Sequence, residues 1–560
     1  TFIACVTLVS FHVLCRAVSI HNFCLNMVLK SPLSPVEIPD NVSLPDFIFS
    51  AAAKYGSKTA YIDFNTKRSL TYQQLLDQVA KVSSALLDRG FQKNDVVFLL
   101  APNCIEYPVI LHAVTKIGGI LTTCNPIYTE VEILQQLRDS GSKYIITIPE
   151  NKDKVQAAAK KYGNVKEMFL IGAAYPGFST YHELTSGGQS VVKTMNFDPK
   201  EQVCLLPYSS GTTGPPKGVM LTHHNVISMV AQISHPDLNV MMPGREVLIG
   251  FLPFFHCYAI CVYLTWALTE GATIVLMTNF DMKDYLQAIQ DYKGTFLHIV
   301  PPIAIRLAKD PIVRNYDVSS VHTIISGAAP LGKEQAEELM ERMGVESVRQ
   351  GYGLTETSTV SNVAPIKGWK HGSVGYLLPN LQAKVIDTSS GKELGPKQKG
   401  ELLFRGPSIM KGYLGRVQAT KGTVDENGWL HSGDIGYYED DGHYYIVDRV
   451  KELIKYNGLQ VAPAELEGHL LTNPSIADCA VIGIPDANAG ELPKAYVVLK
   501  PGHVLSESDV HGWLKGKIAP YKKLRGGVEF VDSIPKSVSG KILRRILKQR
   551  NIKATPVSKL

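Results

Sequence analysis

The chain has 560 residues, of which 45% are hydrophobic and 19% are charged, a composition typical of a globular protein. This length exceeds what one hydrophobic core supports, so we expect two or more domains. The net charge of +6 is a small excess and gives no reason to expect a nucleic-acid partner. The nine cysteines include no CxxC pair and the HExxH pattern is absent, which predicts free thiols in a reducing compartment rather than a zinc site.

The chain begins with Thr and an apolar run, TFIACVTLVSFHVLC (1–15), that is similar to the core of a signal peptide. The run is too short for a membrane span, so we predict no firm membrane segment. Met27 opens a more ordinary sequence. We therefore interpret residues 1–26 as a non-native upstream extension or a gene-model artefact.

Between about residues 45 and 400, short β-branched apolar runs alternate with helical patterns. The runs predict buried strands at 95–100, 143–148, 167–172, 272–277 and 322–326. The stretch 71–90 has apolar residues at helical spacing and ends at Gly90, a predicted C-cap. Strands that alternate with helices predict an α/β fold, with layered and largely parallel sheets flanked by helices.

The pattern changes after about residue 430. Asp441–Gly442 lies between two aromatic runs and predicts a β-hairpin. A helix beginning near Pro463, strands at 477–485 and 494–500, and a helix at 507–518 are expected to follow. We predict a large N-terminal domain over 27–448, a hinge at 449–451, a small mobile α+β C-terminal domain over 452–548 and a flexible tail at 549–560.

The tail ends in Ser558, Lys559 and Leu560. A C-terminal SKL is an address that the peroxisomal import receptor reads. It is a more specific signal than the apolar run at the other end. The sequence therefore predicts a peroxisomal protein with that receptor as a partner.

The segment LLPYSSGTTGPPKGVML (205–221) places glycines and hydroxyl residues between an apolar run and Lys217. Backbone N–H groups, hydroxyls and one cation together favour phosphate binding. The segment does not match the Walker pattern, because Pro216 precedes Lys217 and Gly218 follows it. Its composition alone is equally compatible with a polar surface loop.

Further motifs follow this loop in order. They are FFHCYA (254–259), SGAAPLGKE (326–334), QGYGLTE (350–356), GYLGR (412–416), GWLHSGD (428–434), VDRVKELIKYNGLQVAPAELE (447–467) and PKSVSGKILRR (535–545). With the loop, they resemble the adenylate-forming superfamily over about residues 45–548. This superfamily contains acyl-CoA synthetases, 4-coumarate–CoA ligases, luciferases and adenylation domains, and the nearest group is the 4-coumarate–CoA ligase-like peroxisomal acyl-CoA synthetases. One departure is Pro216, where the family usually has Leu.

The resemblance implies a reaction in two steps that uses ATP, Mg²⁺ and coenzyme A. A carboxylate attacks the α-phosphorus of ATP and gives an acyl-adenylate and pyrophosphate. A thiol then attacks the adenylate and gives a thioester and AMP. The large domain of the family binds ATP and AMP, and its small domain completes the site.

The resemblance also implies the nucleotide-binding residues. They are Ser209, Ser210, Gly211, Thr212, Thr213, Gly214, Lys217, Ala328, Gln350, Gly351, Tyr352, Thr355, Asp434, Arg449 and Lys451. Asp434 and Arg449 match residues that contact the ribose, and Tyr352 matches one that stacks on the adenine. Glu356 matches the carboxylate that binds Mg²⁺, a hard cation that prefers oxygen ligands.

Three side chains match catalytic positions of the family. Lys541 matches the lysine that bridges the substrate carboxylate and the ribose 5′ oxygen, where a cation neutralises charge in the transition state. Lys455 matches a residue that contacts the AMP phosphate in the second step, after the small domain has rotated about Lys451. His256 matches a residue that gates and orients the carboxylate. The segment with Asn457 and Gly458 matches the coenzyme A contact.

His256, Tyr258 and Ile325 match the acyl pocket. The plant 4-coumarate ligases usually carry Lys at the position of Ile325, near the ring hydroxyl of the substrate. An isoleucine cannot serve a phenol, so we expect an apolar carboxylic acid, either a fatty acid or an arylalkanoic acid. Those ligases also carry lysines at the positions of Asn279 and Asn457, and this difference predicts weaker coenzyme A binding.

The sequence leaves three alternatives to a CoA ligase. A luciferase-like monooxygenase would use oxygen in the second step, although the pair His223–His224 departs from the luciferase pattern. A carrier-loading adenylation enzyme would use a partner chain. A binding protein without chemistry is disfavoured, because Lys217, Glu356, Asp434, Arg449 and Lys541 are retained together.

Overall fold

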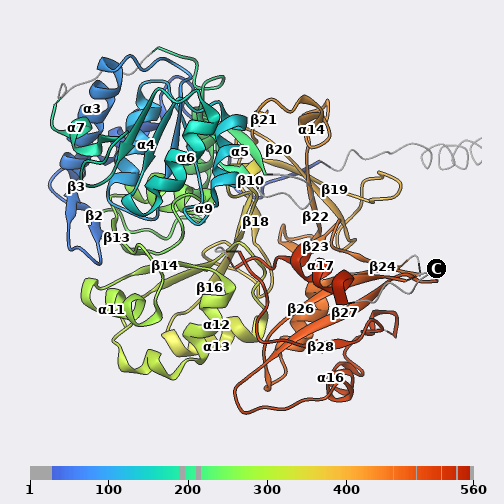
Figure 1. Cartoon of the computed structure of the whole chain (residues 1–560). Helices are drawn as coiled ribbons and strands as arrows, with labels where there is room; N and C mark the ends of the chain where they lie inside the picture. Colours follow the sequence, from blue (N-terminus) through green and yellow to red (C-terminus); the bar gives the residue numbers. More distant parts are fainter. Residues whose placement is uncertain are drawn as a thin grey trace, which may run out of the picture.

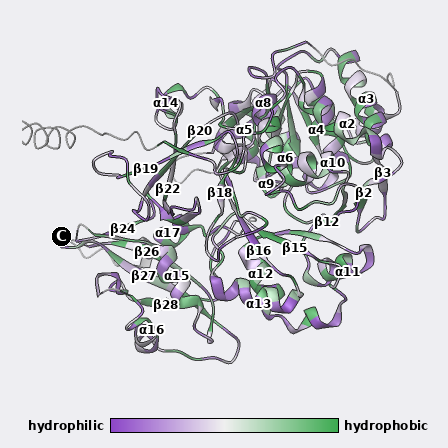
Figure 2. Ribbon diagram, turned by 180° about the vertical axis from the view of Figure 1, so that it is seen from behind, coloured by the Kyte–Doolittle hydropathy of each residue, from purple (hydrophilic) through white to green (hydrophobic). Residues whose placement is uncertain are grey.

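The computed structural model describes residues 28–187, 196–209, 216–457, 459–486, 488–518, 520–537 and 540–554. Four sheets with helices packed against them make up this part of the chain (Figure 1). Figure 2 shows hydrophobic residues concentrated in the strands, whereas a surface helix such as α13 (Lys333–Met343) is mostly hydrophilic. Among the described residues, no helix has the length and hydropathy needed to cross a membrane.

The first sheet has the strand order β10-β11-β9-β5-β4-β6-β7-β8. These strands are β4 (Val96–Leu100), β5 (Ile120–Thr123), β6 (Tyr144–Thr147), β7 (Glu167–Leu170), β8 (Ser179–Thr180), β9 (Val203–Leu205), β10 (Tyr208–Ser209) and β11 (Lys217–Thr222). β4 pairs in parallel with β5 and β6, and its residues are all buried. Val97 and Leu99 belong to one core cluster and Phe98 and Leu100 to another, so helices cover both faces of this sheet. A continuous apolar run is what a parallel strand buried on both faces requires.

Four helices flank this sheet: α3 (Tyr72–Asp88), α4 (Glu106–Lys116), α5 (Glu130–Ser140) and α6 (Lys152–Tyr162). α3 begins with a capping box, in which Thr71 accepts a hydrogen bond from the Gln74 N–H. Its C-cap is Arg89, one residue before the predicted Gly90, and Gly90 follows at φ +76°, where a side chain would be strained.

The second sheet has the order β18-β17-β16-β15-β14-β12-β13-β2-β3. Its strands are β2 (Thr59–Asp63), β3 (Ser69–Thr71), β12 (Val247–Gly250), β13 (Thr273–Leu276), β14 (Phe296–Ile299), β15 (Thr323–Ser326), β16 (Val348–Tyr352), β17 (Asn362–Val363) and β18 (Tyr376–Leu377). The run from β2 through β13, β12, β14 and β15 to β16 is parallel. The five strands predicted from apolar runs are confirmed as β4, β6, β7, β13 and β15.

The third sheet is antiparallel, with the order β1-β19-β20-β22-β23. Its strands are β1 (Leu29–Lys30), β19 (Gln382–Ile386), β20 (Gly400–Arg405), β22 (Leu430–Tyr438) and β23 (Tyr444–Arg449). The hairpin predicted at Asp441–Gly442 is confirmed, since β22 and β23 pair around it and Gly442 has φ +89°. The parallel part of the second sheet ends at β16, earlier than the predicted limit near residue 400, because β17 and β18 pair antiparallel. Antiparallel pairs also occur earlier in the chain, between β2 and β3 and between β11 and its neighbours β9 and β10. Short strands joined by turns had given no strong sequence signal.

The fourth sheet follows residue 453 and has the order β25-β24-β27-β26, with β28 beside β27. Its strands are β24 (Ile454–Tyr456), β25 (Leu459–Val461), β26 (Ile476–Asp486), β27 (Gly490–Leu499) and β28 (Val528–Phe530), and its helices are α15 (Pro463–Leu471), α16 (Glu507–Leu514) and α17 (Arg544–Ala554). Its apolar residues form core clusters separate from the main one. Figure 1 shows these orange and red elements gathered beside the second sheet. The predicted fold class is confirmed, while the exact domain boundaries stay predictions.

Candidate active site

One large cavity, of about 1900 Å³, lies where the sheets meet the C-terminal elements. Its wall contains most of the described residues that the sequence had singled out. They are Ser209, Lys217, His256, Tyr258, Ile325, Ala328, Gly351, Tyr352, Thr355, Glu356, Asp434, Arg449, Lys451, Lys455 and Lys541. A wall assembled from so many segments explains why these residues are widely separated in the sequence.

Asp434 is the centre of a polar group on one side of the cavity. It lies on β22 directly opposite Arg449 of β23, and its Oδ1 is 3.2 Å from the Arg449 Nε. The Tyr352 hydroxyl donates a hydrogen bond of 2.7 Å to the Asp434 Oδ2. A carboxylate has further lone pairs, so Asp434 can still accept hydrogen bonds from two ligand hydroxyls.

The charge of Asp434 depends on its neighbours. Asp434 is only 3% exposed, and this burial raises the pKa of its carboxyl group. Arg449, the hydrogen bond from Tyr352 and the charge of Lys541 oppose that shift. Cationic and hydrogen-bonding neighbours thus stabilise a carboxylate that burial alone would disfavour.

Lys541 comes to this group from the C-terminal elements. Two hydrogen bonds tie its backbone to Ser537: the Ser537 N–H donates to the Lys541 carbonyl, and the Lys541 N–H donates to the Ser537 hydroxyl. Just beyond it, the Arg544 guanidinium forms ion pairs of 2.7 Å with both Glu452 and Glu467. These bonds fix the start of α17 and hence the position of Lys541.

The ammonium group of Lys541 lies in a place that is unfavourable for a charge. Burial, and after it the positive charge of Arg449, lowers the pKa of Lys541 to about 8. Glu452, Asp434 and Glu356 act in the opposite direction. Such a perturbed lysine in a cavity is typical of a functional group.

The predicted phosphate loop starts and ends at the cavity. Ser209 and Lys217 are paired across the antiparallel strands β10 and β11. The Lys217 Nζ lies 4.7 Å from the centre of the Tyr413 ring, which leaves the ammonium group near the cavity wall. Ser210, Gly211, Thr212, Thr213 and Gly214 lie outside the described residues.

Glu356 lies close to this lysine, in the short 3₁₀ helix η5 (Thr355–Thr357). Its Oε1 accepts a hydrogen bond of 2.8 Å from the Tyr413 hydroxyl, and it is buried. The part of the chain that the structure describes contains no cluster of three or more acidic, His or Cys side chains able to hold a metal ion. Glu356 thus presents a buried carboxylate at the cavity wall, and a carboxylate oxygen is a ligand that a hard cation prefers.

The predicted adenine contacts divide into two groups. Ala328, Gly351 and Tyr352 line the cavity, and Ala328 has φ +69°, a strained conformation of the kind found at binding sites. Gln350 instead uses its side chain inside the fold, where its Oε1 accepts from the Leu331 N–H at 2.9 Å. The structure thus gives Gln350 a supporting position behind the wall.

His256 caps helix α9 (Cys257–Cys261), because its Nδ1 accepts a hydrogen bond of 3.2 Å from the Tyr258 N–H. The Cys257 Sγ lies 3.8 Å from the same nitrogen and 3.5 Å from the Thr355 hydroxyl. Burial disfavours the imidazolium, but Cys257 outweighs it and raises the pKa of His256. His256 lines the cavity and is linked through Cys257 to Thr355 on its polar side.

The apolar side of the cavity is formed by aromatic and aliphatic side chains. It includes Ile233, Leu238, Cys261, Val262, Trp266, His298, Ile325, Val360 and Val363. Ile325, on β15, is 7% exposed, and its side chain is apolar and carries no charge. Sequence reasoning missed Trp266 and His298, because both occur inside apolar runs that read as ordinary core.

The C-terminal residues have more varied positions. Lys455, on β24, is exposed at the edge of the cavity. Asn457 follows β24 with φ +47°, and Tyr456 pairs with Leu459, which is the geometry of a tight hairpin turn. The positive φ at this turn accounts for an asparagine at position 457. Gly458 lies outside the described residues.

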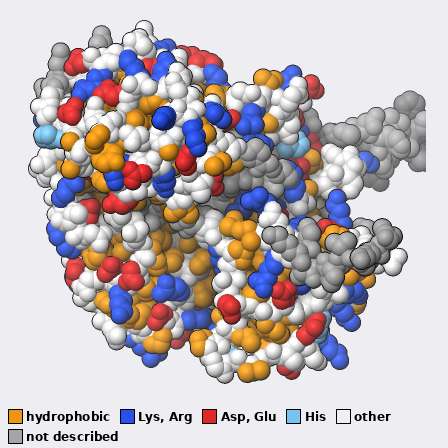
Figure 3. All heavy atoms as spheres, in the orientation of Figure 1, with side chains coloured by type: hydrophobic (Ala, Val, Ile, Leu, Met, Phe, Trp, Pro, Cys, Tyr) orange, Lys and Arg blue, Asp and Glu red, His pale blue; other side chains and the backbone are white. Residues whose placement is uncertain are grey.

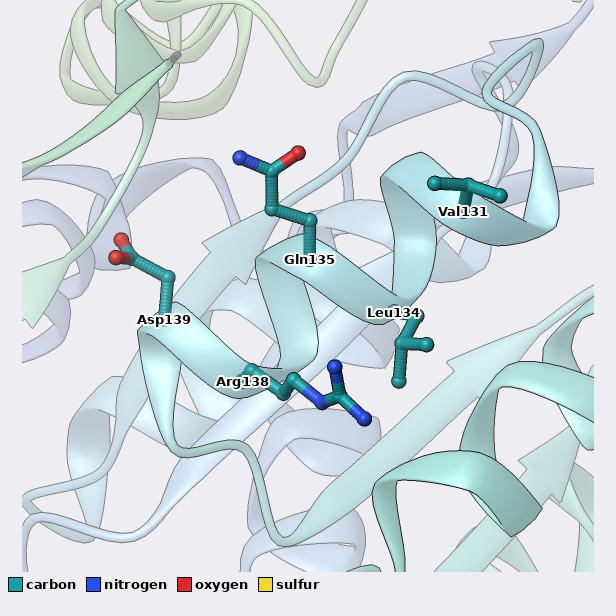
Figure 4. Close-up of a pocket in the computed structure, with 5 residues that line it drawn as sticks. All are labelled: Val131, Leu134, Gln135, Arg138 and Asp139. Atoms are coloured by element: carbon teal, nitrogen blue, oxygen red, sulfur yellow. The ribbon is translucent and has the colours of Figure 1, made fainter.

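Sequence reasoning also missed a polar cluster that joins three segments. Asp139 of α5 accepts hydrogen bonds from the Tyr208 hydroxyl at 2.8 Å and from Arg416 at 2.7 Å. Arg416 belongs to the GYLGR motif, but the motif gives no hint of this partner. Asp139 also borders a second pocket, of about 430 Å³, which is lined by residues of α5 (Figure 4).

Comparison with known proteins agrees with this geometry. The family model "AMP-binding enzyme" matches residues 48–414, and the model "AMP-binding enzyme C-terminal domain" matches residues 465–541. A 4-coumarate–CoA ligase of Pinus taeda is 41% identical over 530 residues, which cover 93% of this chain and 97% of the relative. The peroxisomal OPC-8:0-CoA ligase 1 of Arabidopsis thaliana is 39% identical, with coverage of 93% and 96%.

Solved structures show the same fold. ATP-bound MatB from Rhodopseudomonas palustris superimposes with a TM-score of 0.83 at 28% identity, covering 91% of this chain and 99% of that one. The anthranilate CoA ligase AuaEII in complex with anthranoyl-AMP gives a TM-score of 0.85 at 24% identity, covering 92% and 98%. The resemblance predicted from the motifs is confirmed: the chain belongs to the AMP-binding, adenylate-forming enzymes, among relatives that are CoA ligases.

Proposed function

We propose that this enzyme is an ATP-dependent acid–CoA ligase that converts an apolar carboxylic acid to its acyl-CoA. The observation that carries the proposal is the cavity itself. It joins a polar group suited to a nucleotide, Asp434 with Arg449 and Tyr352, to an apolar side suited to an acyl chain. His256 lies between the two, where a carboxylate would meet the nucleotide.

In the first step, the carboxylate oxygen attacks the α-phosphorus of ATP, and the bond to pyrophosphate breaks. Asp434 holds the ribose hydroxyls and Tyr352 packs on the adenine. Lys217 and Lys541 neutralise phosphate charge, which is largely a matter of positioning and electrostatics. Thr355 would contact the α-phosphate, and Glu356 would supply one oxygen ligand to the Mg²⁺ that accompanies ATP.

In the second step, the thiolate of coenzyme A attacks the acyl carbon, and the bond to AMP breaks. We propose that the C-terminal elements rotate about Lys451, so that Lys455 replaces Lys541 at the nucleotide. Lys455 is exposed at the edge of the cavity, so its ammonium group would lose little hydration when it replaces Lys541. The segment around Asn457 then contacts coenzyme A.

The apolar wall supports the proposed substrate class. Ile325 offers no charge or hydrogen bond to a phenol, and Val262, Val363 and Leu238 favour an alkyl or aryl group by burial of apolar surface. Fatty acids and arylalkanoic acids would bury their apolar chains against this wall. The phenol of 4-coumarate would find no hydrogen-bond partner in Ile325.

We also propose a peroxisomal location. The relative from Arabidopsis is named a peroxisomal ligase, and residues 558–560 read SKL, a receptor-read address. These residues lie outside the described part of the chain. A fluorescent fusion that keeps the tripeptide at its C-terminus is expected to enter peroxisomes.

The test of the function is release of pyrophosphate and AMP across a panel of carboxylates, with and without coenzyme A. The panel holds fatty acids from hexanoate to stearate, cinnamate, 4-coumarate and beetle luciferin. We expect turnover with an apolar acid that coenzyme A accelerates. Pyrophosphate release that coenzyme A does not accelerate would contradict the ligase assignment and favour oxygen or a carrier protein as the second acceptor. Preference for 4-coumarate would overturn the assigned substrate class.

A further inference from the structure

Ser209 and Lys217, two of the residues assigned to the nucleotide, lie on the neighbouring strands β10 and β11. They are paired across these strands, and Tyr208 is paired with Gly218. β10 consists of Tyr208 and Ser209 alone, and so short a strand contributes few hydrogen bonds to the sheet. Its position therefore also depends on side-chain contacts with the rest of the fold.

Asp139 provides such a contact from helix α5. Its Oδ2 accepts a hydrogen bond of 2.8 Å from the Tyr208 hydroxyl, and Figure 4 shows its carboxylate directed away from Arg138, the preceding residue on the same helix. Burial, and after it Asp139, raises the pKa of Tyr208, so the phenol keeps its hydrogen and donates it. Because Ser209 directly follows Tyr208, this bond also limits where Ser209 can lie.

The other carboxylate oxygen of Asp139 holds a second neighbour of β11. Its Oδ1 accepts a hydrogen bond of 2.7 Å from the Arg416 guanidinium. The Arg416 N–H donates to the Tyr413 carbonyl, and strand β21 (Gly412–Tyr413) pairs with β11. The Tyr413 hydroxyl donates to Glu356, and the centre of its ring lies 4.7 Å from the Lys217 Nζ. Asp139 is thereby connected to two strands that pair with the strand of Lys217.

These contacts join segments that are far apart in the chain. Asp139 is 69 residues from Tyr208 and 277 residues from Arg416. The side chain of Asp139 is 21% exposed and that of Arg416 is 33% exposed, so neither is a fully hydrated surface charge of the kind that contributes little. Hydrogen bonds to a charged acceptor are also stronger than neutral ones. One carboxylate thus holds together three segments of the cavity wall, to which all three side chains belong.

We propose that Asp139 is a positioning residue for the β- and γ-phosphates of ATP. It holds Ser209 and Lys217 in place relative to Tyr413 and Glu356, and so raises the affinity for these phosphates without contacting the nucleotide. Donors and charges that are already in position when a ligand arrives bind it more tightly. AMP lacks both phosphates, so Asp139 favours ATP over AMP. This inference rests on the proposed function, in which this segment binds the phosphates of ATP.

The test measures the affinity of the full chain for ATP and for AMP, by calorimetry with Mg²⁺ and without a carboxylic acid. Asp139→Ala removes both hydrogen bonds, and Tyr208→Phe removes one hydroxyl and keeps the ring. We expect the Kd for ATP to rise about tenfold in the first variant and about fivefold in the second, and the Kd for AMP to stay within about twofold of the wild-type value. Equal losses for ATP and AMP would indicate a merely structural role and overturn the proposal, as would an unchanged Kd for ATP.

Tyr175→Phe is the matched control. The Tyr175 hydroxyl also donates to an aspartate, Asp153 of α6, at 3.1 Å, but neither residue belongs to the described wall of the cavity. Both Kd values are therefore expected to stay at their wild-type values. A selective loss of ATP affinity in this control as large as that in Tyr208→Phe would contradict a role specific to Asp139.

A double variant tests whether Asp139 acts through Tyr208. Asp139→Ala combined with Tyr208→Phe should weaken ATP binding no more than Asp139→Ala alone, because the hydroxyl has no partner left to lose. Losses that multiply would refute this route. Tyr208→Phe is a mild change, so its ATP and AMP affinities decide the question even if Asp139→Ala does not fold.

Lys217→Ala separates this inference from the proposed function. It should weaken ATP binding more than AMP binding. If it spares ATP, the assignment of the phosphate site falls, and the inference falls with it. If Lys217→Ala weakens ATP selectively while Asp139→Ala and Tyr208→Phe do not, the inference alone is wrong. In kinetics, the two latter variants should raise the KM for ATP in pyrophosphate exchange and retain thioester formation from supplied acyl-adenylate, whereas a folding defect would lower both rates together.

Discussion

Replacing Lys541 with methionine should make the ligand-free protein more stable while removing its first reaction step. Burial and Arg449 lower the pKa of Lys541 from 10.5 to about 8. One pKa unit corresponds to about 1.4 kcal/mol, so holding this ammonium group in its native place costs on the order of 3 kcal/mol at neutral pH. Methionine has a similar length and no charge, so Lys541→Met should recover about 2 to 3 kcal/mol.

The pH dependence gives the sign of the effect. Because the folded-state pKa is below the unfolded one, the unfolded chain binds more protons between about pH 8 and 10.5, and the wild-type stability rises with pH through that window. The stability difference between Lys541→Met and the wild type should therefore be full at pH 7 and should shrink as the pH approaches 10. The free energy of unfolding in denaturant measures it, and Lys515→Met, which removes an exposed lysine, is the matched control.

The same variant tests the chemistry. We expect Lys541→Met to lower the rate of pyrophosphate exchange by about a thousandfold or more, because a cation at the forming adenylate acts mainly in the transition state. Thioester formation from supplied acyl-adenylate should be largely retained. In the wild type, kcat/KM for ATP should fall as the pH rises through about 8, where Lys541 loses its proton. A variant that is less stable than the wild type at pH 7 would refute the electrostatic reasoning, and one that keeps pyrophosphate exchange would refute the catalytic role.

The other predictions concern separate parts of the molecule. Lys455→Ala should retain pyrophosphate exchange and lose most thioester formation, and equal loss of both rates would contradict the rotation. Glu356→Gln should raise the Mg²⁺ concentration needed for half-maximal exchange by about tenfold, since the metal loses its anionic ligand; an unchanged Mg²⁺ requirement would contradict this. Gly353→Ala should lower the free energy of unfolding by about 2 kcal/mol or more, because its Cβ would lie 2.3 Å from a backbone carbonyl oxygen, whereas Gly468→Ala has open space around it and should be neutral or stabilising. Deleting residues 558–560 should move a fluorescent fusion from peroxisomes to the cytosol, and a fusion that stays in peroxisomes would contradict the assigned address.

Charge is mixed over the face of the molecule seen in Figure 3, where Lys and Arg are interspersed with Asp and Glu. The concentration of charged groups that matters is internal. Lys541, Arg449 and Asp434 meet inside the cavity. The net charge of the chain therefore said little about this site, because the site contains few charged side chains and these lie beside charges of opposite sign.

Much of the architecture could be predicted from the sequence because its signals are local. The buried strand 95–100 is a continuous apolar run, the helix at 71–90 carries its spacing and its terminal Gly90, and the Asp441–Gly442 turn requires a residue that tolerates positive φ. The motifs identified the family for a similar reason. Each one is a short segment whose residue types are restricted by a backbone conformation or by a ligand.

The sequence by itself thus determined the fold class and the family, and most of the described residues that it singled out line the cavity. Only the tertiary structure decided that Gln350 supports the wall from behind, that Asp139 joins Tyr208 and Arg416, and that Trp266 and His298 both line the cavity. The physical reason is that a side chain buried in an apolar run looks the same in the sequence whether or not its polar atom has a partner. Whether it does depends on strands and helices that are distant in the chain, and their arrangement exists only in the folded molecule.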